Sequence, residues 1–190
     1  RKFVENFYNR ISFCWAYLFP LWYGKNESRK VVRYADLKSR HNVLDFGCGT
    51  GITTFEIAKH LDKGIVTGYD ISSKQVERAE KKLIKLKHKN VIFEKSKKKK
   101  FKKNSFDAVT AVGVIEHLEN PEKMLKNLFF VLKPGGTFSF LVFGKSFKIP
   151  SPQVMAEGEL KKILDSLPVE YTIKKEKKKF TEYYYVYGRK

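Results

Sequence analysis

The sequence predicts an α/β fold of the Rossmann-like kind: a mostly parallel seven-stranded sheet, helices on both faces, and an antiparallel strand pair at the C-terminal end. Three observations predict it. Short β-branched segments alternate with helical patterns between residues 42 and 143, which is typical of parallel βαβ units. A glycine-rich turn joins the first of these strands to the first helix. Only a short Lys/Glu run separates the last two strand patterns, and so short a connection implies an antiparallel pair.

The alternating part of the chain is expected to supply five parallel strands, of which the fourth is apolar enough to be buried on both faces. Their predicted ranges are 42–46, 64–69, 91–94, 106–112 and 137–143. Apolar residues at three- and four-residue steps predict helices between them, over 52–61, 73–86 and 121–132. Ser72 or Ser73 is expected to cap the second of these helices, and the Lys-Pro-Gly-Gly run at 133–136 should end the third.

The two ends of the chain have a different character. Helical periodicity predicts a helix over 2–19, ended by Pro20, and a second helix over 27–37. After the fifth strand the pattern predicts a helix over 157–167 and strands over 169–174 and 180–187. We therefore expect one domain, in which residues 1–38 form a helical cap or lid on a core of residues 39–190. The lysine-rich stretches 95–103 and 174–179 are expected to be solvated loops.

Composition bounds the class of protein without choosing a function. At 190 residues and 42% hydrophobic residues the chain can bury one globular core. Lys and Arg number 39 against 20 Asp and Glu, and the formal net charge of +19 favours anions: nucleic acid, an acidic membrane surface or acidic substrates. The two cysteines, Cys14 and Cys48, do not suggest a disulfide framework, which favours a reducing cytoplasm. No secretory signal is visible, and the apolar stretch 11–23 is too short to cross a bilayer.

The glycine turn after the first strand is the most informative feature. Gly47, Gly49 and Gly51 are spaced two apart, so the third glycine falls one residue too early for the dinucleotide fingerprint, and no phosphate-loop Lys follows. Asp45 precedes the turn; its carboxylate would repel a pyrophosphate but attract the ammonium and sulfonium of S-adenosylmethionine. The following helix would offer its free N–H groups to the ligand. The alternative interpretation is an ordinary tight strand-to-helix turn.

A second carboxylate, Asp70, closes the second strand. In an open α/β sheet ligands bind beyond the carboxyl ends of the strands, and an acidic residue about 20 residues past a glycine turn can accept ribose hydroxyls. Ile71 would then offer an apolar face to an adenine ring. The alternative is that Asp70 merely stabilises the dipole of the next helix. Its spacing from the turn favours the ribose role.

Together these residues resemble the class I S-adenosylmethionine-dependent methyltransferases. Five motifs occur in the family's order over about residues 30–145, and the antiparallel terminal strand pair is also a family feature. The Glu-His pair and the Leu-Lys-Pro-Gly-Gly run resemble the small-molecule branch that includes the ubiquinone/menaquinone C-methyltransferases and the bacterial phosphatidylethanolamine methyltransferases, as does the segment 7–11 with Asn in place of Asp. The motifs are 43–51 (VLDFGCGTG), 68–72 (GYDIS), 104–109 (NSFDAV), 114–118 (VIEHL) and 132–136 (LKPGG).

The resemblance implies S-adenosylmethionine as the cofactor and a set of residues that bind it. The glycine turn and its flanks would surround the methionyl part, Asp70 would bind the ribose, Ile71 would line the adenine, and Val112 and Gly113 would lie near the sulfonium. The turn residues so implied are Asp45, Phe46, Gly47, Cys48, Gly49 and Gly51. One departure stands out: the family usually places Gly-Asp after the third strand, whereas this chain has a lysine run at 95–100, so the adenine amine would bond to a backbone carbonyl or to Ser96.

Candidate catalytic groups are few. The methyl group on a sulfonium is already activated, so alignment and exclusion of water can supply much of the rate, and a base is needed only if the nucleophile carries a proton. Glu116 and His117 follow the fourth strand and are the candidates for acid–base work; the alternative is that they bind backbone amides and pack beneath the cofactor. Tyr8 and Tyr23 are candidates for the substrate pocket, with core packing as the alternative. The four histidines show no metal-ligand spacing, so no metal is expected.

Three functional hypotheses follow. The first is methyl transfer to a small, apolar acceptor of lipid or quinone type, motivated by the aromatic N-terminal segment; peripheral contact with an anionic membrane would accompany it. The second is an RNA methyltransferase that uses the lysine-rich stretches as phosphate contacts; the Asn/Asp-Pro-Pro-aromatic signature of amino-directed nucleic-acid methyltransferases is absent from the end of the fourth strand. The third is a non-catalytic module that keeps cofactor binding. The acceptor atom and the oligomeric state are left open.

Overall fold

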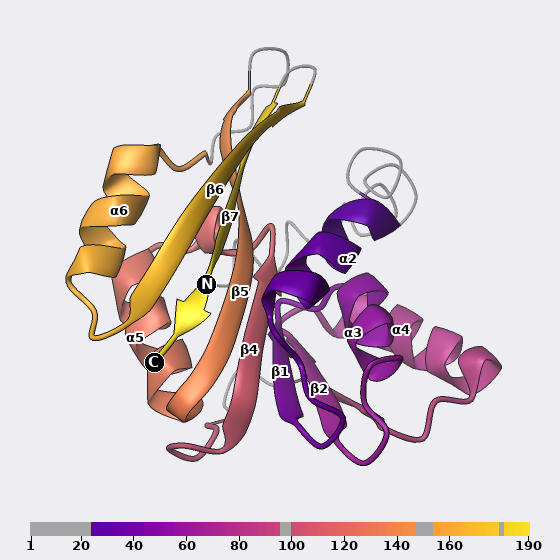
Figure 1. Cartoon of the computed structure of the whole chain (residues 1–190). Helices are drawn as coiled ribbons and strands as arrows, with labels where there is room; N and C mark the ends of the chain where they lie inside the picture. The colour runs from indigo at the N-terminus through magenta and orange to yellow at the C-terminus, as the bar shows by residue number, and fades with distance from the viewer. Residues whose placement is uncertain (1–23, 96–99, 147–153, 179–180) are drawn as a thin grey trace.

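The structure, a computed structural model, describes residues 24–95, 100–146, 154–178 and 181–190 (Figure 1). The predicted helix over 2–19 and the candidate pocket residues Tyr8 and Tyr23 lie outside these ranges, and the division into a cap (1–38) and a core (39–190) stays a prediction. Five α-helices and one short 3₁₀ helix are found in the described part. They are α2 (Lys25–Tyr34), α3 (Ile52–Ala58), α4 (Ser73–Leu86), η2 (Ile115–His117), α5 (Pro121–Val131) and α6 (Glu157–Asp165).

The seven strands form one sheet in the order β3-β2-β1-β4-β5-β7-β6. The first five strands run parallel, and β7 pairs antiparallel with both β5 and β6. The predicted fold class is therefore confirmed. The strands are β1 (Asn42–Phe46), β2 (Ile65–Asp70), β3 (Val91–Lys95), β4 (Phe106–Val112), β5 (Leu132–Ser146), β6 (Glu170–Lys178) and β7 (Thr181–Arg189).

The structure corrects several expected boundaries. The Lys/Glu run up to Lys178 is not a loop but the second half of β6, because its ladder with β7 continues to the Lys178–Thr181 pair. Strand β5 begins directly after α5, and residues between Leu132 and Thr137 bulge where the β4 register shifts. Helix α2 begins and ends earlier than expected, and α3, α5 and α6 end one to three residues early.

The helices cover the two faces of the sheet in separate layers (Figure 1). Helices α5 and α6 cover one face, where Leu125, Phe138, Phe140 and Leu164 belong to one cluster of buried side chains. Helices α2, α3 and α4 cover the other face. Because β5 and β7 extend past the end of β4, the antiparallel pair rises above the edge where the parallel strands end.

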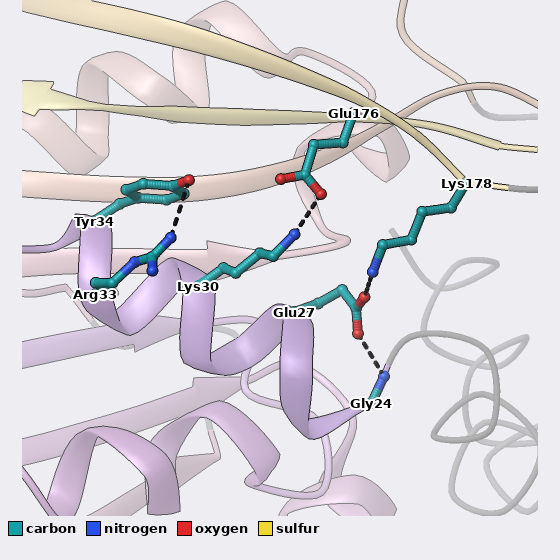
Figure 2. A network of polar contacts seen from close by, with 7 residues as sticks. All are labelled: Gly24, Glu27, Lys30, Arg33, Tyr34, Glu176 and Lys178. Atoms are coloured by element: carbon teal, nitrogen blue, oxygen red, sulfur yellow. Dashed lines mark hydrogen bonds and ion pairs between the residues drawn. The ribbon is translucent and has the colours of Figure 1, made fainter.

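Polar contacts tie α2 to strand β6 across the top of the sheet (Figure 2). Glu27 accepts a hydrogen bond from the Gly24 N–H at 3.0 Å and forms an ion pair with Lys178, while Lys30 pairs with Glu176. These contacts fix the first turns of α2 beside the hairpin of β6 and β7. No helix in the described ranges is both long and apolar enough to cross a membrane.

Candidate active site

The turn after β1 is held by the end of β2. The N–H groups of Gly47 and Cys48 both donate to the Tyr69 carbonyl, at 2.7 and 3.0 Å, and the Gly51 N–H donates to the Cys48 carbonyl at 2.9 Å. All three glycines of the turn have positive φ, including +53° at Gly49, a conformation that costs other residues free energy. The backbone conformation of the turn therefore explains why glycines occur at these three positions.

Gly49 differs from the other two glycines in what surrounds it. A Cβ at Gly47 would lie 2.3 Å from Val114, and one at Gly51 would lie 2.8 Å from Phe55, whereas a Cβ at Gly49 would meet nothing within 4 Å. Gly47 and Gly51 are thus required by packing against the protein. The open side of Gly49 leaves room for a bound group to approach the backbone, so the turn fits a ligand at this point.

Asp45 lies under the turn and is 1% exposed. Its two oxygens accept hydrogen bonds from the hydroxyls of Thr54 on α3, at 2.6 Å, and Thr110 on β4, at 2.8 Å. Burial raises the pKa of the Asp45 carboxyl to about 6, although the two hydroxyls oppose the shift. The structure directs this side chain into the core, where it joins β1, α3 and β4. Its predicted contact with a methionyl ammonium stays a prediction.

Asp70 fastens the turn to the next helix. One oxygen accepts from the Gly49 N–H at 2.9 Å and the other from the Ser72 N–H at 2.8 Å, and burial raises the pKa of the carboxyl. Ser72 caps α4 by accepting from the Gln75 N–H, as one of the two predicted caps. Ile71 beside it is 38% exposed, so its apolar face is free for a planar ring.

Two further turn residues have well-defined places. Phe46 stacks on Tyr69 with ring centroids 5.5 Å apart, on the α5 side of the sheet. The Cys48 thiol is buried and its pKa is raised by burial, so it is not a reactive thiol. A cation that the sequence analysis did not single out also reaches the turn: Lys82 of α4 donates to the Thr50 carbonyl at 3.2 Å.

The end of β4 closes the other side of the turn. Gly113 has φ +63° and donates its N–H to the Leu141 carbonyl at 2.9 Å, and a Cβ there would lie 2.6 Å from the Phe143 ring. Phe143 in turn packs edge-on against Tyr183 of β7, with centroids 5.4 Å apart. Val112 and Gly113 therefore lie where the end of β4 meets the extended β5–β7 pair; their predicted place near the sulfonium stays a prediction.

Glu116, in η2, is a carboxyl group that is buried without a clear partner. Its side chain is 0% exposed, and no described group donates a hydrogen bond to either oxygen. Burial raises its pKa to about 8, and the nearby backbone N–H groups of Glu116 and Phe143 offset this only in part. The His117 Nε2 lies 3.8 Å from Glu116 Oε1. The predicted pair thus stands together at the end of β4; whether it is catalytic stays a prediction.

The described residues contain no group of three or more His, Cys, Asp or Glu side chains that could hold a metal ion. The polar groups at the turn are the buried Asp45 carboxyl, the part-buried Asp70 carboxyl, backbone N–H groups, and the N-terminus of α3. This set fits the nucleoside and amino-acid parts of S-adenosylmethionine.

Comparison with known proteins identifies the family of the chain. The methyltransferase domain family model matches residues 44–138, which is half of the chain, and the chain belongs to this family. A ubiquinone biosynthesis O-methyltransferase of Coxiella burnetii is 34% identical over 120 residues, 62% of this chain and 50% of the relative. A malonyl-[acyl-carrier protein] O-methyltransferase of Halalkalibacterium halodurans is 31% identical over 180 residues, 79% of this chain and 66% of the relative. The chain thus spans about half the length of the ubiquinone biosynthesis relatives it matches.

Among solved structures, a SAM-dependent methyltransferase from Aquifex aeolicus is 27% identical, with a TM-score of 0.73 over 85% of this chain and 89% of that one. The resemblance to class I S-adenosylmethionine-dependent methyltransferases of the small-molecule branch is therefore confirmed. S-adenosylmethionine is the cofactor of this class. The acceptor differs among the relatives by their names, so it does not follow from membership.

Proposed function

We propose that this protein transfers the methyl group of S-adenosylmethionine to a small, apolar acceptor of lipid or quinone type. The observation that carries the proposal is the surroundings of the β4 end. Val112, Phe143 and Tyr183 belong to one apolar cluster beside it, Val114 packs against Gly47 of the turn, and Glu116 adds one buried carboxyl group. Such a lining suits a ring or chain with a single polar atom. The names of the relatives, one of them for ubiquinone biosynthesis, support the same acceptor class.

Each part of the site has a distinct task in this proposal. When bound, the cofactor supplies a methyl group on a cationic sulfur, which leaves by in-line displacement. The turn N–H groups and the start of α3 orient the methionyl part, Asp70 accepts from the ribose hydroxyls, and Ile71 covers the adenine. Val114 and Phe143 exclude water from the β4 end, so that alignment supplies much of the rate.

In this proposal Glu116 forms a hydrogen bond with the polar atom of the acceptor or takes a proton from it. With a pKa of about 8, its carboxyl is mostly protonated at pH 7 and can donate a hydrogen bond to an acceptor oxygen. Above that pH it is ionised and can take a proton from a hydroxyl nucleophile. His117 Nε2 is near enough, at 3.8 Å, to relay that proton after a small movement. Methyl transfer to a hydroxyl acceptor should then become faster as pH rises through 8.

The structure gives less support to an RNA acceptor. Of the two lysine-rich stretches, the one in β6 is engaged by acids of its own chain: Lys175 pairs with Glu157 and Glu182, and Lys178 pairs with Glu27. Those ammonium groups are not poised for phosphates. An apolar acceptor would reside in a membrane, and a net charge of +19 favours an anionic leaflet; a cytoplasmic place with peripheral membrane contact is part of the proposal.

Radiolabelled cofactor tests this function. The protein is incubated with methyl-labelled S-adenosylmethionine and, separately, with phenolic quinone precursors in lipid vesicles, malonyl-[acyl-carrier protein] and bulk tRNA. We expect label in the solvent-extracted phenolic fraction, and loss of that label in the Glu116→Gln protein. Label in tRNA alone would overturn the acceptor class. Cofactor binding with no label in any pool, across pH 6 to 9, would favour the non-catalytic module.

A further inference from the structure

Lys82 reaches the glycine turn from behind. Helix α4 packs on the sheet through Val76 and Ala79, which are both fully buried, and Lys82 lies beside that face, on the side of α3. Its ammonium donates to the carbonyl of Thr50 at 3.2 Å. Thr50 lies between Gly49 and Gly51, the two glycines that lead into α3. A side chain far along the helix therefore contacts the backbone that receives the cofactor.

The other anchors of the turn come from a different direction. Its entering half is held by the end of β2: Gly47 and Cys48 donate to the Tyr69 carbonyl, and Gly49 donates to Asp70. The leaving half begins at Thr50. Among the described side chains, Lys82 donates a hydrogen bond to the carbonyl of Thr50. The turn is thus clamped from β2 on one side and from α4 on the other.

Charge gives Lys82 a second effect. The buried Asp45 and the part-buried Asp70 place two carboxyl groups next to the turn, and the charge of Asp70 is among the causes that raise the pKa of Asp45. Such a field opposes the carboxylate of an amino-acid ligand. Lys82 is an exposed residue whose ammonium turns back onto the Thr50 carbonyl, and the pKa of that ammonium is lowered mainly by burial and also by Arg78; its positive charge offsets the field of the two carboxylates.

We infer that Lys82 is a positioning residue for cofactor binding: it holds the leaving half of the glycine turn in its ligand-ready form and supplies positive potential beside the start of α3. This inference rests on the proposed function only in taking the cofactor to bind at this turn. The competing explanation is that Lys82 is one more solvated lysine of α4. Lys81, its neighbour on the same helix, is exposed as Lys82 is; it represents that case and provides a matched control.

The test compares Lys82→Met, Lys82→Arg and Lys81→Met by titration calorimetry with S-adenosylhomocysteine. Methionine keeps the length and helix propensity of the side chain and removes its charge and donors. We expect the Kd to rise roughly tenfold in Lys82→Met, because a hydrogen bond from a charged group is lost. It should stay within twofold of the parent protein in Lys81→Met and be largely restored in Lys82→Arg. Melting temperatures of Lys82→Met and Lys81→Met should agree.

Amide hydrogen exchange adds a local measure. In Lys82→Met the N–H groups of Gly49 and Gly51 should exchange faster, while those in the centre of β4 keep their protection. An unchanged Kd in Lys82→Met, an equal loss in Lys81→Met, or a general loss of protection would each overturn the inference. If the parent protein fails to bind S-adenosylhomocysteine, the proposed function is wrong; if the parent binds and Lys82→Met binds equally well, only the inference is wrong.

Discussion

The site has two halves at the carboxyl edge of the sheet, and the acidic side chains of these halves differ in their hydrogen-bond partners. In the cofactor half, Asp45 accepts from the hydroxyls of Thr54 and Thr110, and Asp70 accepts from two backbone N–H groups. In the half that we propose binds the acceptor, Glu116 is also buried, and the backbone N–H groups of Glu116 and Phe143 offset the rise of its pKa only in part. The pKa values follow this difference: burial raises Asp45 to about 6 and Glu116 to about 8.

This difference shows in which half the acidic side chains already have their hydrogen-bond partners within the protein. A buried polar group without a partner costs roughly 1–3 kcal/mol, so folding alone does not favour Glu116 in its place. The cofactor half has formed its contacts within the protein and needs only a ligand that fits. In the half that we propose binds the acceptor, the Glu116 carboxyl can still form a hydrogen bond with a polar atom of the acceptor.

The largest expected effect concerns the open side of Gly49. Gly49→Ala should weaken S-adenosylhomocysteine binding by roughly 30- to 100-fold, since the new methyl group would occupy space that the ligand needs. Gly135→Ala is the matched control, because Gly135 also has positive φ, +72°, and also has nothing within 4 Å of its would-be Cβ. Both variants should lose about 1 kcal/mol of stability to backbone strain. Calorimetry and urea unfolding measure the two effects; equal affinities would mean that the turn is no cradle.

A second prediction concerns the unpartnered acid. The folded-state pKa of Glu116 is raised from 4.5 to about 8, so the folded state binds an extra proton between these values. The parent's unfolding free energy, measured relative to Glu116→Gln, should then be highest below pH 4.5 and fall by roughly 1–3 kcal/mol as pH rises through 8. Urea unfolding at pH 5, 7 and 9 tests this. Glu77→Gln, at an exposed position of α4, should run parallel to the parent throughout.

The partnered acid should show a smaller and earlier transition. Burial raises the folded-state pKa of Asp45 from 3.8 to about 6, so the stability that its protonated form contributes is lost between those values. Relative to Asp45→Asn, whose amide can still bond to Thr54 and Thr110, the parent should lose roughly 1–2 kcal/mol from pH 4 to pH 6 and nothing from pH 7 to pH 9. A further divergence above pH 7 would show that the two halves do not differ as described.

Sequence reasoning found the parts of this site that depend on local backbone geometry. Glycines at 47, 49 and 51 are required by positive φ values, and a carboxylate at 70 can reach Gly49 because neighbouring parallel strands end together. The alternation of patterns likewise determined the order of strands and helices. These features depend on residues close together in the sequence, so that their spacing is enough to predict them.

The missed features join residues that are far apart in the chain. The direction of Asp45 depends on Thr110, 65 residues away, and the contact of Lys82 with Thr50 spans 32 residues. The second half of β6 was expected to be a loop because its lysines look solvated; Glu27 and Glu157, on two different helices, neutralise them in the fold. Periodicity cannot show which partner a charged side chain will meet.

The smallest expected effect concerns another buried acid, Glu27, whose ion pair with Lys178 joins α2 to β6. Glu27 is 6% exposed and Lys178 is 41% exposed (Figure 2), so Lys178→Met leaves a buried carboxylate with the Gly24 N–H, whereas Glu27→Gln leaves an ammonium that water can solvate. Lys178→Met should therefore destabilise the protein more than Glu27→Gln does. A double-mutant cycle should give a coupling of about 0.5–1 kcal/mol, against nearly zero for the exposed Glu122–Lys126 pair. Equal couplings would mean that the Glu27–Lys178 pair adds nothing to the contact between α2 and β6 beyond what an exposed pair adds.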